Sequence, residues 1–98
     1  MKSSYAKKVD RNQPEIVKAL RSVGAIVKSV HSVPKLFDIL VYFRGQTYCV
    51  EIKDGKLPPS ARTLTRGENE CKQDLESVGV KYWVVLSVKD AFEMIGAE

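Results

Sequence analysis

The sequence predicts a single α/β domain whose elements follow in the order αβββαβα. Its 98 residues, 44% of them hydrophobic and 29% charged, suffice for one core and leave no room for a second domain. An amphipathic segment near the amino terminus precedes three runs rich in Val, Ile, Tyr and Phe. A helix, a strand and a helix follow. We therefore treat residues 1–98 as one domain.

The first half predicts one helix and three strands. Residues 12–23 place apolar side chains at helical spacing, and Asp10 or Asn12 is expected to cap the start of this helix. Pro14 suits a first helical turn, whose amide groups lack partners in any case. The strands are expected at 25–30, 37–43 and 47–52.

The second half predicts a loop, a helix, a strand and a last helix. Residues 54–64 contain two adjacent prolines and no periodicity, which indicates a loop. Thr65 and Glu68 have the T-x-x-E spacing of a capping box, which opens the second helix. Residues 82–86 are apolar on both alternating faces, as in a covered strand, and Ser87 is expected to open the final helix.

Charge is unevenly distributed along the chain. Residues 1–66 carry 13 Lys or Arg against five Asp or Glu, a balance of +8, whereas residues 67–98 carry three against seven, a balance of −4. The net charge of +4 therefore hides a strongly basic amino-terminal two thirds. A polyanion such as a nucleic acid would meet that part first.

Several classes of protein are not expected from this composition. No apolar run approaches the roughly 20 residues of a membrane span, and no signal peptide is recognisable. Two cysteines and one histidine do not support a disulfide framework or a His/Cys zinc cluster. We expect a cytoplasmic protein without a membrane partner or an organic cofactor.

The chemistry is expected around residues 38 and 51–53. Glu51 and Lys53 are two apart on a strand, so both side chains leave the same face. If residues 44 and 45 form a two-residue turn, the numbers of paired residues sum to 89, and Asp38 lies opposite Glu51. Their Cβ atoms would then be about 5 Å apart.

Two carboxylates at this distance repel each other unless a cation compensates them. A hard divalent cation such as Mg²⁺ takes oxygen ligands, and the Ile52 carbonyl would add a third oxygen to Asp38 and Glu51. Lys53 would then orient an attacking water or stabilise charge on a phosphate. The plain alternative is a solvated sheet face, but both acids interrupt apolar runs, which favours a buried site.

The chain contains four spaced motifs: Asp10-Arg11-Asn12-Gln13-Pro14-Glu15, Phe37-Asp38-Ile39-Leu40-Val41, Glu51-Ile52-Lys53-Asp54-Gly55 and Leu64-Thr65-x-x-Glu68. With these motifs the sequence resembles, over nearly the whole chain, the VRR-NUC family of the PD-(D/E)XK nuclease superfamily. The resemblance implies a restriction-endonuclease-like αβββαβ core, a mixed central sheet flanked by helices, plus a C-terminal helix. It also implies Mg²⁺- or Mn²⁺-dependent cleavage of DNA.

The resemblance also implies roles for single residues. Lys53 is the implied catalytic lysine, and Gln73 matches a glutamine that many relatives place near the site. Phe37 stands where the superfamily name expects proline, a position that shapes the strand without binding metal. The implied metal ligands are Asp38, Glu51, the Ile52 carbonyl and, through water, Glu15.

Two further expectations concern partners. Related stand-alone members are homodimers that act on branched DNA such as Holliday junctions, and two sites related by a two-fold axis suit symmetric cleavage. A non-catalytic nucleic-acid-binding module, or a nuclease that acts on flaps or RNA, stays open as an alternative. The candidate contacts to phosphates are Arg11, Lys56, Arg62 and Arg66.

Overall fold

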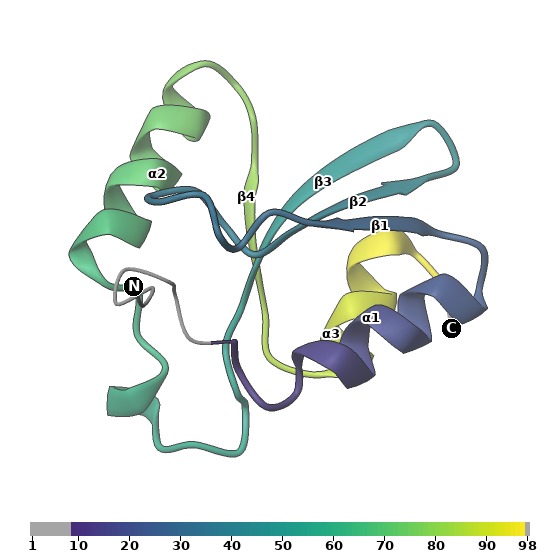
Figure 1. Cartoon of the computed structure of the whole chain (residues 1–98). Coiled ribbons are helices and arrows are strands. Elements are labelled where there is room, and N and C mark those ends of the chain that lie inside the picture. Colours follow the sequence, from purple (N-terminus) through teal and green to yellow (C-terminus); the bar gives the residue numbers. More distant parts are fainter. Residues whose placement is uncertain (1–8, 98) are drawn as a thin grey trace, which may run out of the picture.

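The computed structural model describes residues 9–97 and confirms the predicted α/β class and order of elements (Figure 1). No helix in this range is long and apolar enough to cross a membrane. A short 3-10 turn lies inside the predicted loop. The elements are α1 (Gln13–Ser22), β1 (Ile26–Ser29), β2 (Ile39–Phe43), β3 (Gln46–Ile52), η1 (Pro59–Ala61), α2 (Arg66–Ser77), β4 (Tyr82–Val85) and α3 (Val88–Ile95).

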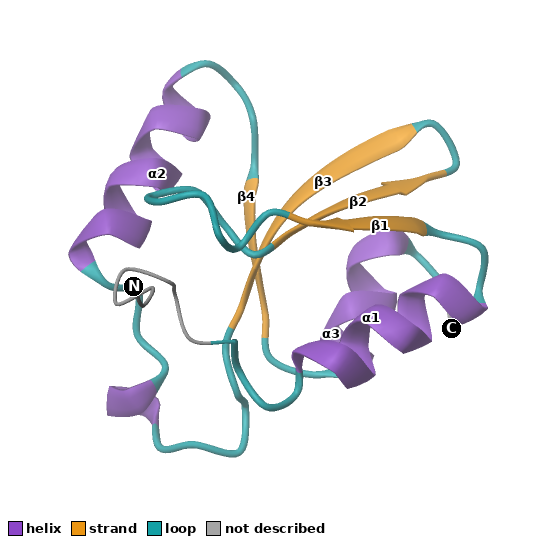
Figure 2. Cartoon of the chain, in the orientation of Figure 1, coloured by secondary structure: helices purple, strands orange, loops and turns teal. Residues whose placement is uncertain are grey.

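The four strands form one mixed sheet in the order β1-β2-β3-β4. The first three strands run antiparallel, and β4 pairs parallel with β3. The parallel pair requires a crossover, which α2 supplies. Helices α1 and α3 lie together on one side of the sheet and α2 lies on the other, so helices flank the mixed sheet (Figure 2).

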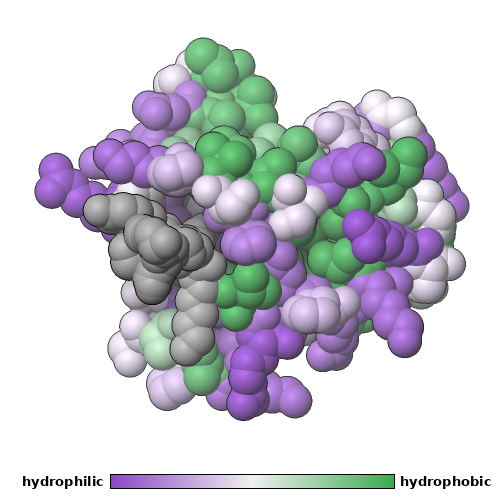
Figure 3. All heavy atoms as spheres, viewed as in Figure 1, coloured by the Kyte–Doolittle hydropathy of each residue, from purple (hydrophilic) through white to green (hydrophobic). Residues whose placement is uncertain are grey.

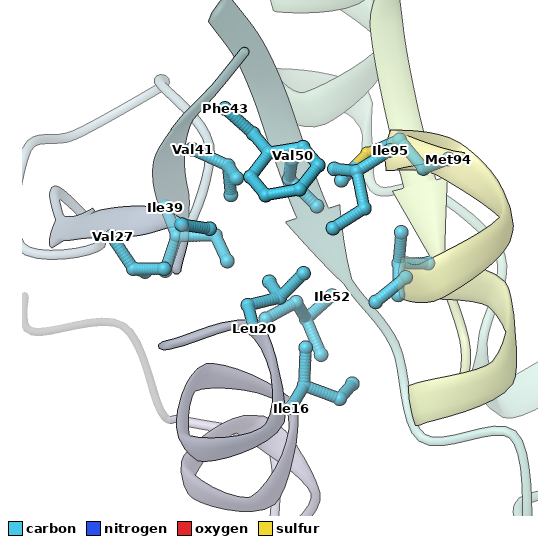
Figure 4. Close-up of a cluster of buried hydrophobic side chains, with 13 residues drawn as sticks. Ile16, Leu20, Val27, Ile39, Val41, Phe43, Val50, Ile52, Met94 and Ile95 are labelled. Carbon is cyan, nitrogen blue, oxygen red and sulfur yellow. The ribbon is translucent and has the colours of Figure 1, made fainter. Parts of the chain in front are cut away.

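The alternation of side chains along the strands divides the core into two clusters. The larger cluster joins α1 and α3 to one sheet face and includes Ile16, Leu20 and Ile52, all fully buried (Figure 4). The smaller cluster contains Phe37, Cys71 of α2 and Tyr82 of β4. Because successive strand residues face opposite sides, Glu51 is directed away from the larger cluster.

The β2–β3 hairpin has the predicted two-residue turn. Arg44 and Gly45 have φ angles of 51° and 79°, the left-handed pair that a tight hairpin turn requires. The ladder runs from Phe43 opposite Gln46 to Ile39 opposite Val50, and every pair of numbers sums to 89. The predicted register is therefore confirmed over these five pairs.

The glycine in this turn carries a testable consequence. Replacing Gly45 by alanine is expected to lower the free energy of unfolding by about 1 kcal/mol, because a Cβ is disfavoured at positive φ. Gly67→Ala is the matched control, because a Cβ there would meet only Lys35 Cγ at 3.7 Å, and it is expected to be neutral or stabilising. Urea denaturation measures both, and equal effects would contradict the argument.

Strand β2 begins two residues later than predicted. The predicted range 37–43 treats Asp38 as a ladder residue, but the ladder ends at Ile39 opposite Val50. The amide of Asp38 donates to the Val50 carbonyl, and its carboxylate takes the Ile52 amide that a regular ladder would assign to a backbone oxygen. The direct Asp38–Glu51 pair is therefore not formed as a strand pair.

Exposed apolar side chains are spread over the described part of the chain, and two of them lie where α2 ends. In Figure 3 hydrophobic atoms gather over the end of α2 and the turn that leads to β4, where Val78 and Val80 are exposed. Further hydrophobic atoms lie in the middle and on the right of the same view, interspersed with hydrophilic ones.

Candidate active site

Buried carboxyl groups gather where β3 ends. Of the described residues, four acids are less than a tenth exposed, and they come from three different parts of the chain. Burial of a carboxylate is costly unless a cation, a proton or hydrogen bonds compensate it. The four are Asp38 in the bend before β2, Glu51 in β3, Asp54 just after β3 and Glu68 in α2.

Lys53 brings two of these acids together. Its Nζ lies 2.7 Å from Glu68 Oε1 and 3.8 Å from Glu51 Oε2. The Lys53 side chain is only 13% exposed, so these contacts form largely out of water. The lysine that the sequence singles out is thus held between an acid of its own strand and an acid of α2.

Asp38 is fixed beside the same stretch of β3. Its Oδ2 accepts a 2.7 Å hydrogen bond from the Ile52 amide, and its own amide donates to the Val50 carbonyl at 3.0 Å. One carboxylate oxygen is therefore committed to the backbone. These two contacts are made to the residues on either side of Glu51, and they hold Asp38 against that part of β3.

Glu51 lies at the bottom of the site and is 1% exposed. The Tyr82 hydroxyl donates to Glu51 Oε1 at 3.4 Å. Burial, together with the charges of Glu51 and Glu68, raises the pKa of Tyr82, so the hydroxyl keeps the proton it donates.

Glu68 has two structural roles at once. Thr65 and Glu68 form the predicted capping box, in which the Thr65 hydroxyl accepts from the Glu68 amide and Glu68 Oε1 accepts from the Thr65 amide at 2.9 Å. Burial alone would raise the pKa of Glu68. Hydrogen bonds from Lys53 and from the Thr65 backbone outweigh burial and lower this pKa to about 2.

This lowered pKa predicts how stability depends on pH. Folding stabilises the ionised form of Glu68, so its contribution is complete above about pH 4.5 and is lost as the pH falls towards 2. Glu68→Gln is expected to remove on the order of 3 kcal/mol of this pH-dependent difference in the free energy of unfolding. Urea denaturation at several pH values tests it. The same curve as the exposed-site control Glu70→Gln would contradict it.

The amino-terminal segment contributes a different acid from the expected one. Burial, opposed by Lys53 and reinforced by Asp38, raises the pKa of Asp10, which places Asp10 within electrostatic reach of both residues. Glu15 is exposed and lines a separate hollow with Asp54. The structure therefore brings Asp10, and not Glu15, towards Lys53.

Gln73 lies on an exposed part of α2. The buried side chains of this helix are Glu68 and Cys71, and Gln73 is about 200° further round the helix than Cys71. It points away from the face that meets the sheet. Glu68, one turn into the same helix, holds the place near the site that the resemblance implies for Gln73.

Asn12 does not cap α1 with its side chain, although it occupies the capping position. Its Nδ2 donates instead to the carbonyls of Lys53 and Leu86, each at 3.1 Å. These carbonyls lie just beyond the ends of the parallel strands β3 and β4, where the backbone needs new donors. The contact fixes the start of α1 against the site.

The predicted phosphate contacts do not form one group. Arg11 Nε lies 4.0 Å from Asp54 Oδ2, and Arg11 and Lys56 line the same hollow of about 520 Å³. Arg62 Nε donates to the Leu57 carbonyl. Arg66 pairs with Glu70 on the surface of α2. Two of the four basic residues thus lie together, on the side of α1 and α3.

The chemical type of the buried acids suits a divalent cation, but their arrangement in this structure does not. Buried carboxylate oxygens are the ligands that Mg²⁺ and Mn²⁺ prefer. Within residues 9–97, however, no three Asp, Glu, His or Cys side chains are placed so that together they could hold a metal ion. In this arrangement the Lys53 ammonium occupies the position between Glu51 and Glu68.

Comparison with protein-family models, with curated proteins and with solved structures finds no match in any of the three. The site is therefore defined by its own geometry. Sequence reasoning missed Asp10, Glu68 and Tyr82 as members of it. For Glu68 a signal existed, because its capping position and its spacing from Cys71 place it on the buried face of α2.

Proposed function

We propose that this protein is a metal-dependent DNA endonuclease that uses Asp38, Glu51 and Lys53. The observation that carries the proposal is the burial of Asp38 and Glu51 around a lysine that is itself largely enclosed. Buried like charges destabilise a small fold, so their concentration at the end of one strand favours a functional role over a structural one.

A cation held by Asp38, Glu51 and the Ile52 carbonyl would polarise a phosphodiester and lower the pKa of a bound water. The chain's own residues account for the remaining requirements. Asp38 and Glu51 provide negative charge at the end of β3, and their contacts to the Ile52 amide and the Tyr82 hydroxyl fix their orientation. Lys53 supplies a positive charge next to the reacting phosphate and a donor for the attacking water.

The resemblance to the VRR-NUC family supports the same proposal and extends it to branched DNA and a homodimer. The observed order of helices and strands agrees with the core that this resemblance implies. The basic balance of residues 1–66 provides the attraction for a polyanion, while the acids stay local to the site. A dimer would present two such sites to the two strands of a junction.

The test is incubation of a labelled four-way junction, a linear duplex and a matched RNA with the protein, with Mg²⁺, with Mn²⁺ and with EDTA. We expect metal-dependent cleavage of DNA that is strongest on the junction. Cleavage of the RNA but of neither DNA substrate would change the proposed substrate from DNA to RNA. Salt-dependent binding without cleavage of any substrate would favour the non-catalytic nucleic-acid-binding module instead.

The dimer is tested separately by light scattering at the concentration used for cleavage. A mass of twice 11.0 kDa is expected. A monomer that still nicks DNA would remove symmetric junction cleavage from the proposal and leave the endonuclease activity in place.

A further inference from the structure

We propose that Glu68 is the positioning residue for Lys53 and thereby couples the start of α2 to the site, an inference that rests on the proposed function. One atom makes the coupling. Glu68 Oε1 accepts from the Thr65 amide at 2.9 Å and from Lys53 Nζ at 2.7 Å. The same oxygen thus closes the capping box and holds the lysine.

The cap explains why the carboxylate is rigid. The Thr65 hydroxyl and the Glu68 amide complete the reciprocal pair of bonds, so the first turn of α2 fixes the direction in which Glu68 leaves the helix. With Glu68 fixed, the flexible Lys53 chain loses most of its freedom, because its Nζ is held within 3.8 Å of Glu51 as well.

The negative charge of Glu68 is not needed for the cap. Glutamine completes a capping box as well as glutamate does, and it does so without burying a charge. Glu68 is 6% exposed and ionised, which is costly in a capping residue. The charge therefore serves the Lys53 contact, and helix capping alone does not account for it.

This arrangement gives Glu68 a distinct part in the reaction. It holds the Lys53 Nζ along the face that Glu51 shares, and we assign it no contact with the substrate. A reacting group displaced by about 1 Å loses about 10²-fold in rate, so the loss of this anchor is expected to appear in kcat. Because Glu68 is assigned a role in orienting Lys53 and none in holding the DNA, KM is expected to change little.

Three variants separate positioning from structure. Glu68→Gln keeps the capping box and removes the charge. Thr65→Ala weakens the cap and keeps the Lys53 contact. Glu70→Gln removes an exposed carboxylate that takes part in neither the cap nor the Lys53 contact. Circular dichroism and thermal unfolding establish that each variant is folded. The first readout is acetylation of Lys53 by an amine-reactive ester, followed by mass spectrometry without metal or DNA.

We expect Lys53 in Glu68→Gln to be acetylated about tenfold faster than in wild type, because its Nζ is no longer held 2.7 Å from a carboxylate and is freer to meet the reagent. The second readout, cleavage of the junction with Mg²⁺, is expected to show a kcat lower by about 10²-fold in Glu68→Gln, with KM within about threefold. Glu70→Gln is expected to match wild type in both readouts. Thr65→Ala keeps the carboxylate but weakens the cap that orients it, so it is expected to be less stable and to fall between wild type and Glu68→Gln in both readouts.

Unchanged acetylation in Glu68→Gln would overturn the proposal, and so would a kcat that falls as much in Thr65→Ala as in Glu68→Gln. The two readouts also keep this inference separate from the proposed function. A wild-type protein that cleaves nothing would overturn the endonuclease and any role of Glu68 in it, whereas the acetylation rates would still decide whether Glu68 holds Lys53.

Discussion

Asp38→Asn is expected to lower the rate of metal-dependent DNA cleavage by roughly 10³-fold, the order of loss seen when one electrostatic group of a preorganised site is removed. The substitution isolates the charge. An asparagine oxygen can still accept the 2.7 Å bond from the Ile52 amide, so the bend before β2 is expected to keep its shape. The measurement is single-turnover cleavage of the labelled junction with Mg²⁺.

The matched control is Asp74→Asn, which removes the same charge from an exposed position on α2. Its cleavage rate is expected to stay within about twofold of wild type, because exposed charges contribute little and are screened by salt. Activity retained in Asp38→Asn would assign cleavage to another site. Loss of activity accompanied by loss of the folded circular dichroism signal would show a structural role for the carboxylate instead.

The parts of the fold that local chemistry determines could be predicted from the sequence. Arg44 and Gly45 define a two-residue turn, and the turn alone sets the register of the whole hairpin. Likewise, Thr65 and Ser87 are recognisable as caps, and both accept the amide three residues on. In each case the partners are at most a few residues apart in the chain.

The parts that were not predicted depend on contacts between distant segments. Asn12 is a good capping residue, yet its side chain bonds carbonyls 41 and 74 positions away. Asp38 leaves the ladder because its side chain replaces a backbone acceptor for Ile52. Spacing along the chain carries no information about either choice, since each is made by tertiary packing.

The candidate site shows the same division. The pattern of Glu51 and Lys53 on one strand face was sufficient to single them out, and Lys53 does lie beside Glu51. The resemblance places Gln73 of the second helix near the site, whereas in the structure Glu68 of that helix contacts the lysine. The difference is one of helix register: residues at positions 68 and 71 face the sheet, and position 73 does not.

Removing the lysine is expected to reveal how much unbalanced charge the fold contains. Lys53→Met keeps most of the side-chain volume but withdraws the cation that contacts both Glu51 and Glu68. Breaking a buried ion pair by removing one partner costs about 3–5 kcal/mol, a large part of the stability of a domain of this size. Urea denaturation in EDTA measures the loss. Lys72→Met, which breaks an exposed pair with Glu76, is expected to cost under about 1 kcal/mol.

The same variant tests the cation site without any cleavage assay. If Asp38 and Glu51 hold a divalent cation, the ion supplies the balancing charge that Lys53→Met lacks, and added Mg²⁺ or Mn²⁺ is expected to raise its stability. At 100 times the dissociation constant the gain is about 2.7 kcal/mol. Lys53→Met combined with Asp38→Asn should lose most of this gain, because one ligand carboxylate is then neutral. A loss of stability in Lys53→Met that no divalent cation reverses would mean that these acids are balanced by protons, and would contradict the metal site.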